Sequence, residues 1–155
     1  MKNLVLITAL CLFSVSVFAD SGQDNLKNDV IKKVSPYSVT ETMDKFEAIV
    51  KKKGFGIFAR IDHKKNAKDA GMELNDAQVL IFGNPKGGTV LMKQDINIAL
   101  DLPLRVAVYK EADKVYIAYH NPIAMATNYQ LKDNKVIPKI TKGLDKLTAI
   151  AIEGK

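Results

Sequence analysis

The chain has 155 residues, of which 47% are hydrophobic and 26% are charged, and it carries a formal net charge of +6. This length corresponds to one ordinary domain with room for a normal hydrophobic core. No internal repeat or low-complexity tract interrupts the sequence, and its single cysteine excludes a fold held together by disulfides.

The first 19 residues predict a cleavable export signal. Lys2 supplies a basic start, an apolar run follows over residues 4–19, and Ala19 precedes a polar stretch that begins with Asp20. The run has about 16 residues, fewer than the about 20 that span a membrane, so a retained anchor is the weaker alternative. Cleavage leaves 136 of the 155 residues and removes Cys11, the only cysteine. We therefore expect a periplasmic or secreted protein without thiol chemistry and without a stable membrane anchor.

Basic residues outnumber acidic ones by five after cleavage, and many lysines lie in clusters at residues 51–53, 64–68 and 132–142. Arginine is the preferred side chain for recognising phosphate groups and base edges, yet the chain has only Arg60 and Arg105. Aromatic residues do not interleave the lysines. The sequence therefore predicts a solvated basic surface and no nucleic-acid partner, with contact to an anionic lipid or polymer as a weaker alternative.

The first half of the mature chain begins with a polar lead-in at residues 20–33, followed by a single domain over residues 34–155. A short strand is predicted at 34–39, and Thr40 is expected to cap a helix over 41–53. Alternation of apolar residues predicts a strand at 55–62, with a short polar helix at 63–70 after it. A buried strand at 79–82 then leads into a glycine-rich turn at 83–88.

The second half is expected to start with a helix over 89–99, which a Leu-Pro segment ends. Two alternating runs at 104–109 and 115–119 predict a hairpin, Pro122 should open a short helix to about residue 129, and an amphipathic helix is expected over 140–152. The predicted fold is one compact α+β domain with a mixed sheet of about five strands and helices packed on it. Crossovers through helices should make sheet neighbours parallel, with the final hairpin antiparallel.

Several segments resemble those of one bacterial protein family, called domain of unknown function 302. They are Ile61-Asp62-His63, Ala70-Gly71, Phe82-Gly83-Asn84-Pro85-Lys86, Gly88-Thr89, Ala99 to Arg105 and Tyr119-His120-Asn121-Pro122. The resemblance extends from about Tyr37 to Ile152. It implies a compact α+β fold, a homodimer and no established activity.

His63 is the first candidate site residue, because imidazole titrates near neutral pH and can act as acid, base or metal ligand. The structural alternative is that Asp62 caps the next helix and His63 lies in its first turn. If the strands ending at Asp62 and Phe82 run parallel, His63 and Asn84 should emerge at one end of the sheet. His120 should then lie at the opposite end, so no metal site built on both histidines is expected.

The glycine-rich turn is the second candidate, because free backbone N–H groups in such a turn can bind an anion. The spacing of Gly83 and Gly88 is close to that of a phosphate-binding loop, but Thr89 stands where the essential lysine should be. The candidate ligand-binding residues are Gly83, Asn84, Gly87, Gly88, Thr89 and Arg105. The alternative is a tight turn that needs glycine for its dihedral angles.

Two further features are expected to be mainly structural. Arg105 could pair with Asp101 or with a bound carboxylate, next to a Leu-Pro turn that stops a helix. Tyr109, Tyr116 and Tyr119 should cover the sheet, or line a pocket or dimer interface.

The sequence contains no complete catalytic constellation and indicates no metal or cofactor. A non-catalytic module that binds a small ligand or a partner is therefore the favoured interpretation. The alternative is a cofactor-independent enzyme in which His63 is the acid or base, while Asn84 and the glycine-turn amides stabilise negative charge.

Overall fold

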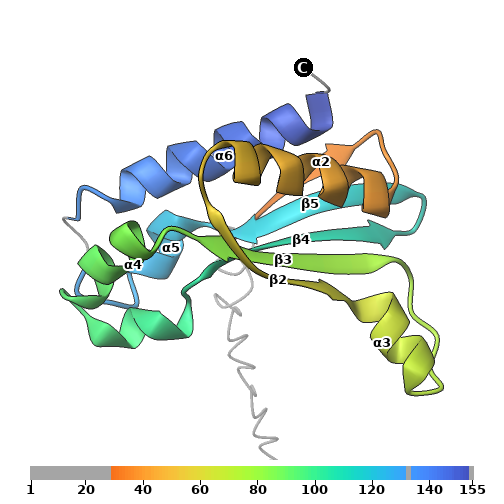
Figure 1. Cartoon of the computed structure of the whole chain (residues 1–155), viewed down its shortest axis with the longest axis horizontal. Helices are drawn as coiled ribbons and strands as arrows, with labels where there is room; N and C mark the ends of the chain where they lie inside the picture. The colour runs from red at the N-terminus through yellow and green to blue at the C-terminus, as the bar shows by residue number, and fades with distance from the viewer. Residues whose placement is uncertain (1–28, 132–133, 154–155) are drawn as a thin grey trace, which may run out of the picture.

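A single antiparallel sheet carries the helices of the computed structural model, which describes residues 29–131 and 134–153 (Figure 1). The predicted export signal and most of the lead-in lie outside the described residues. In chain order the elements are β1 (Val30–Ser35), α2 (Val39–Lys52), β2 (Gly56–Asp62), α3 (His63–Asp69), β3 (Ala77–Gly83), α4 (Pro85–Met92), the 3-10 helix η1 (Ile96–Leu100), β4 (Leu104–Glu111), β5 (Lys114–His120), α5 (Pro122–Ala126) and α6 (Ile137–Glu153).

The five strands lie in the order β1-β5-β4-β3-β2, and every neighbouring pair is antiparallel. The α+β class, the single domain and the C-terminal helix are confirmed, whereas the expected parallel pairs in a mixed sheet are wrong. The helices α3 and α4 extend the two ends of the sheet, so the chain turns back beside the strand it has just left (Figure 1). Only α2 carries the chain across the sheet, from edge strand β1 to edge strand β2.

The helices α2 and α6 cover one face of the sheet (Figure 1). Phe46 of α2 meets Phe82 of β3 edge to face, with 5.4 Å between the ring centroids, and neither side chain is exposed. Each large apolar side chain buried in this way contributes about 1.5–3 kcal/mol to stability. The other residues of this core that are buried in full are Met43, Val50, Leu80, Val106, Val108, Ile117 and Ala151.

The opposite face of the sheet bears Tyr109 and Tyr116, whose rings lie 5.9 Å apart. The ammonium group of Lys32 lies 3.9 Å from the centroid of the Tyr116 ring. Tyr119 points to the helix-covered face, where it is buried, so the three tyrosines do not share one surface. None of the described helices is long and apolar enough to cross a bilayer.

Several element boundaries differ from the predicted ones, because local capping decides where helices begin. The first strand starts at Val30 inside the expected lead-in, and Ser38, not Thr40, caps α2 by accepting a hydrogen bond from the Glu41 amide. The helix expected to start at Thr89 begins at Pro85, since Asn84 acts as its cap and proline suits the first turn. The last helix, expected over 140–152, already begins at Ile137.

A bulge in β2 turns Arg60 toward the helices. The register shifts between Ile57 and Ala59, so that Ile57 pairs with Phe82 and Arg60 pairs with Leu80 on the same face. Unbroken alternation would place Arg60 on the opposite face from Ile57.

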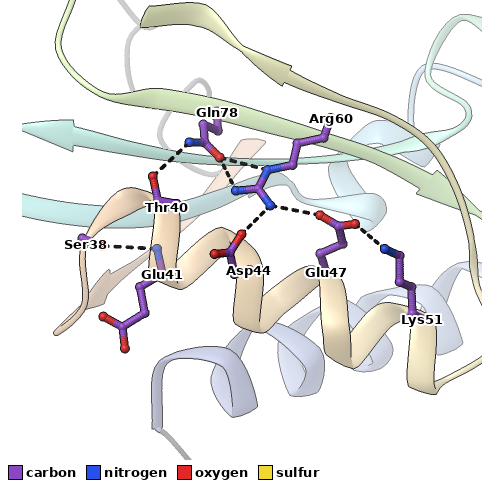
Figure 2. Close-up of polar contacts among 8 residues, drawn as sticks. All are labelled: Ser38, Thr40, Glu41, Asp44, Glu47, Lys51, Arg60 and Gln78. Atoms are coloured by element: carbon purple, nitrogen blue, oxygen red, sulfur yellow. Dashed lines mark hydrogen bonds and ion pairs between the residues drawn. The ribbon is translucent and has the colours of Figure 1, made fainter. Parts of the chain in front are cut away.

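Arg60 consequently joins the edge of the sheet to α2 (Figure 2). Its guanidinium group donates to Asp44 Oδ1 at 2.5 Å and Glu47 Oε2 at 3.1 Å, and two of its nitrogens donate to Gln78 Oε1. Hydrogen bonds from Lys51 and then Arg60 lower the pKa of Glu47, against the opposing effect of partial burial.

The hydroxyl group of Tyr119 is buried between β5 and α6 without a hydrogen-bond partner among the described residues. Burial raises the pKa of this phenol, with Asp145 adding to the effect. Nearby Thr148 acts slightly in the other direction, but its own hydroxyl already donates to the backbone of α6.

Replacing Tyr119 with phenylalanine is expected to leave the free energy of unfolding unchanged or to raise it by up to about 1 kcal/mol, because an unsatisfied buried hydroxyl is removed. Chemical denaturation of both proteins measures the difference. A loss of more than about 1 kcal/mol would show that the hydroxyl has a stabilising partner.

Candidate functional site

An apolar cavity of about 360 Å³ lies at the end of the sheet opposite α3. It forms where the core under α2 and α6 meets a second buried cluster around Leu91 and Ile98. A volume of this size is typical of small-ligand sites. Its lining comes from β2, the β3–α4 junction, the segment from η1 to β4, and the start of α6, and it comprises Phe55, Phe58, Gly83, Asn84, Pro85, Gly87, Gly88, Thr89, Leu91, Met92, Ala99, Leu102, Pro103, Leu104, Val136 and Ile140.

The wall is almost entirely apolar. Among the described residues that line the cavity, only Asn84 and Thr89 have polar side chains. Asn84 caps α4 and Thr89 lies in the middle of this helix, so the polar groups are confined to the α4 side of an otherwise hydrophobic space. Such a cavity suits a ligand with a hydrophobic body and few polar atoms.

The glycine-rich turn does line the cavity, but as the first part of α4. Of the candidate residues, Gly83, Asn84, Gly87, Gly88 and Thr89 belong to the wall, whereas Arg105 does not. Asn84 Oδ1 accepts a hydrogen bond from the Lys86 amide at 3.0 Å, and the Gly88 amide donates to the Asn84 carbonyl at 3.0 Å. Two amides of the turn are therefore already engaged, that of Lys86 by the capping side chain of Asn84 and that of Gly88 by the first hydrogen bond of the helix.

The lack of a side chain at Gly88 keeps the cavity open. A β-carbon at this position would lie 3.7 Å from Leu102 Cδ1 and 3.9 Å from Met92 Cε, both atoms of the wall. At Gly83 a β-carbon would lie 3.5 Å from Pro103 and 3.6 Å from the Phe58 ring. These are ordinary contact distances, so larger side chains at either glycine would grow into the space that a ligand needs.

The expectation that His63 and Asn84 lie together is wrong. Asp62 pairs with Gln78 at the start of β3, whereas Gly83, just before Asn84, pairs with Gly56 at the start of β2. About 20 Å of antiparallel strand separates the two ends. His63 is exposed in the first turn of α3, and Asp62 caps that helix by accepting from the Lys65 amide at 2.9 Å. The two residues cannot act on one bound molecule within this chain.

His120 ends β5 at the same end of the sheet as Asn84, and His63 lies at the other end. The expected separation of the two histidines is thus correct, although the parallel strands on which it was argued are not present. No cluster of three or more histidine, cysteine, aspartate or glutamate side chains that could hold a metal ion occurs in the described part of the chain.

A polar network fastens η1 beside the cavity. Asp101 accepts from the Tyr129 hydroxyl at 2.5 Å and forms the expected ion pair with Arg105 at 3.6 Å. The hydrogen bond to Asp101 raises the pKa of Tyr129. Asp95 accepts from the amides of Gln130 and Asn97, which lower its pKa. These carboxylates hold the loop between α4 and β4 against the segment that precedes α6.

Most of the wall could not be recognised in the sequence. The segment Leu102-Pro103 was visible as a helix stop, and Phe55 as a strand residue, but neither pattern indicates a cavity. Met92, Val136 and Ile140 read as ordinary apolar residues of helices or connections. A shared wall built from separate segments leaves no local signal, because its members meet only after the chain has folded.

Comparison with known proteins identifies relatives of the whole domain. A family model described as "Domain of unknown function DUF302" matches residues 31–147. The crystal structure of an uncharacterised conserved protein from Bacillus stearothermophilus, described with the same family, superposes with a TM-score of 0.64. It is 17% identical and the match covers 80% of this chain and 95% of that one, which shows a shared fold.

Longer proteins also contain a similar stretch. The chain is 39% identical over 98 residues to the Fluoride-specific ion channel FluC 1 of Brucella suis biovar 1 (strain 1330), and equally to FluC 2 of Brucella melitensis biotype 1. The match covers 63% of this chain but only 39% and 36% of those proteins. The chain thus spans little more than a third of the curated relatives it matches.

Proposed function

The chain belongs to the family described as Domain of unknown function DUF302, and we propose that it is a non-catalytic binding module whose cavity holds a small apolar or amphiphilic ligand. The observation that carries this proposal is the 360 Å³ cavity with an almost wholly apolar wall. An apolar ligand would gain about 25 cal/mol for each Å² of its surface removed from water. Asn84 and Thr89 would orient the polar end of the ligand.

Binding is favoured over catalysis because the groups expected to cooperate in a reaction do not meet. His63 lies at the far end of the sheet from the cavity, and the residues of the wall supply no acid, base or nucleophile of ordinary strength. The small anionic ligand that the glycine turn suggested is accommodated within this proposal as an amphiphile with a negative head group. Its hydrophobic part would occupy the cavity.

The relatives from Brucella support the description of this chain as a module. In these proteins, named as fluoride-specific ion channels, a stretch similar to this chain forms part of a longer polypeptide. A region of this kind can therefore work as a module beside other functional segments. Channel activity is not part of the proposal, since the similarity covers little more than a third of those proteins.

Native mass spectrometry of the protein purified from its own cells tests the proposal. We expect the spectrum to show a small molecule bound non-covalently, which collisional activation releases. We also expect the mass of a chain that begins at Asp20 after export. The family resemblance also leads us to propose a homodimer, which the same spectrum would report.

A matched experiment uses the neutral fluorescent probe N-phenyl-1-naphthylamine with protein freed of ligand. Saturable binding, displaced by single-chain amphiphiles, is the expected result. A protein that arrives empty and also fails to bind the probe would contradict a ligand-binding role.

A further inference from the structure

Large apolar side chains are exposed beside the cavity. The short helix η1 buries Ile98 completely, yet Leu100 is 78% exposed and Ile96 is 68% exposed. Val90 of α4 and Phe58 of the cavity wall are exposed as well. Phe58 itself lines the cavity, as do Thr89 and Ala99, the chain neighbours of Val90 and Leu100.

The same end of the molecule carries positive charge without acidic partners. Lys86 and Lys93 lie at the two ends of α4, while Lys135 and Lys139 flank the start of α6, and all four are exposed. None of them has a carboxylate within 4.0 Å among the described residues.

The acidic groups nearby are already engaged within the chain. Asp95 accepts hydrogen bonds from backbone amides, and Asp101 accepts from Tyr129 and pairs with Arg105. At the opposite end of the sheet two lysines are paired, Lys64 with Asp76 and Lys65 with Asp69. Four exposed lysines without a carboxylate partner among the residues that the structure describes therefore lie at the same end of the molecule as the exposed side chains of Ile96 and Leu100.

We propose that this end, the docking end, formed by Phe58, Lys86, Val90, Lys93, Ile96 and Leu100, binds the surface of an anionic lipid bilayer. The negative surface attracts the lysine ammonium groups, and the apolar side chains enter the boundary between head groups and acyl chains. A second copy of the chain is a poorer occupant, because a two-fold interface would bring the lysines of both copies together. Docking here would place the apolar cavity next to the lipid.

Co-sedimentation with vesicles tests docking. The protein is mixed with vesicles of phosphatidylcholine containing roughly 30% phosphatidylglycerol, first at about 50 mM and then at about 500 mM salt. Binding at low salt that falls steeply at high salt is expected, with little binding to pure phosphatidylcholine. Absence of binding at low salt overturns the proposal.

Paired variants locate the surface. Ile96→Ser with Leu100→Ser is expected to reduce vesicle affinity roughly tenfold, since both side chains insert. The control is Met72→Ser with Leu74→Ser, which removes two exposed apolar side chains, 65% and 47% exposed, at the opposite end. That control should change the affinity less than about twofold.

A second pair separates local from overall charge. Lys86→Gln with Lys93→Gln should weaken binding roughly tenfold or more. Lys64→Gln with Lys65→Gln changes the net charge by the same amount at the far end and should have a much smaller effect. Equal losses of vesicle affinity in both double variants would show that net charge alone attracts the protein, and would overturn the proposal that the docking end binds the bilayer.

A second copy of the chain is the remaining possible occupant of this surface, and sedimentation velocity would detect such self-association. If the Ile96→Ser and Leu100→Ser variant dissociates a dimer instead of losing vesicle binding, the surface is an interface between copies and the proposal fails. Vesicle binding is measured without any probe or ligand, so failure of docking and failure of the ligand proposal are distinguishable.

Discussion

Replacing Gly88 with leucine is expected to lower the affinity for the fluorescent probe at least tenfold while the protein stays folded. The β-carbon would enter the space beside Leu102 and Met92 at ordinary contact distances, and the rest of the side chain would occupy the cavity. Because Gly88 lies within helix α4, the substitution should also increase stability by about 0.5–1 kcal/mol through helix propensity.

The control for this variant is Gly143→Leu in helix α6. A β-carbon there meets no atom within 4 Å, and the residue does not line the cavity. It should provide the same gain in helix propensity without any change in probe affinity. Fluorescence titration and thermal unfolding of both variants measure the two quantities. If the Gly88 variant is folded and binds the probe as the parent does, the ligand does not occupy this cavity.

Replacing Arg60 with methionine is expected to destabilise the protein by about 2 kcal/mol at neutral pH. The side chain of Arg60 is 28% exposed and that of Glu47 is 18% exposed, so the pair is better shielded from solvent than most surface ion pairs. Methionine would leave Gln78, which is buried, without the guanidinium donors that now satisfy its carbonyl oxygen. It would also leave two carboxylates close together.

Arg105→Met is the matched control, because its ion pair with Asp101 is longer, at 3.6 Å, and more exposed. That variant should lose less than about 1 kcal/mol. Urea unfolding at several ionic strengths separates the two arginines. Similar losses for both would contradict a special role for Arg60 in joining α2 to the sheet.

The effect at Arg60 should also depend on pH. The pKa of Glu47 is lowered in the folded state, so its contribution to stability is present above the unfolded value of about 4.3. This contribution disappears as the pH falls through the lower folded pKa. Lys51, the main cause of this lowering, remains in the variant, so only the smaller contribution from Arg60 is lost. The difference between parent and Arg60→Met should therefore shrink modestly as the pH falls from about 5 toward 3.

The helices α2, α3 and α6 and the final hairpin were the elements that sequence patterns predicted best, whereas the helix expected over residues 89–99 is divided into α4 and the 3-10 helix η1. The alternation in β4 and β5 and the turn between them were recovered, because a hairpin is made of contacts close in sequence. The class of fold followed from the order of elements. The direction of β2 relative to β3 did not, since nothing in the polar segment around α3 distinguishes a crossover from a helix that extends the end of the sheet.

The same missing information led to the wrong pairing of His63 with Asn84. One reversed strand moves a residue from one end of the sheet to the other, and the error passes to every site argued from strand direction. The bulge at Phe58 likewise changes which face of the sheet a residue lies on. It places Arg60 under α2, although a strictly alternating strand would turn it away from Ile57.

The amino-acid sequence by itself determined the class of fold, the hairpin, the C-terminal helix and the capping of α3 by Asp62. These features depend on periodicity and on hydrogen bonds between near neighbours. Only the tertiary structure decided that the segment from Gly83 to Thr89 forms one side of an apolar cavity. Its other walls come from β2, the η1–β4 segment and α6, and side chains so distant along the chain acquire a common surface only through folding.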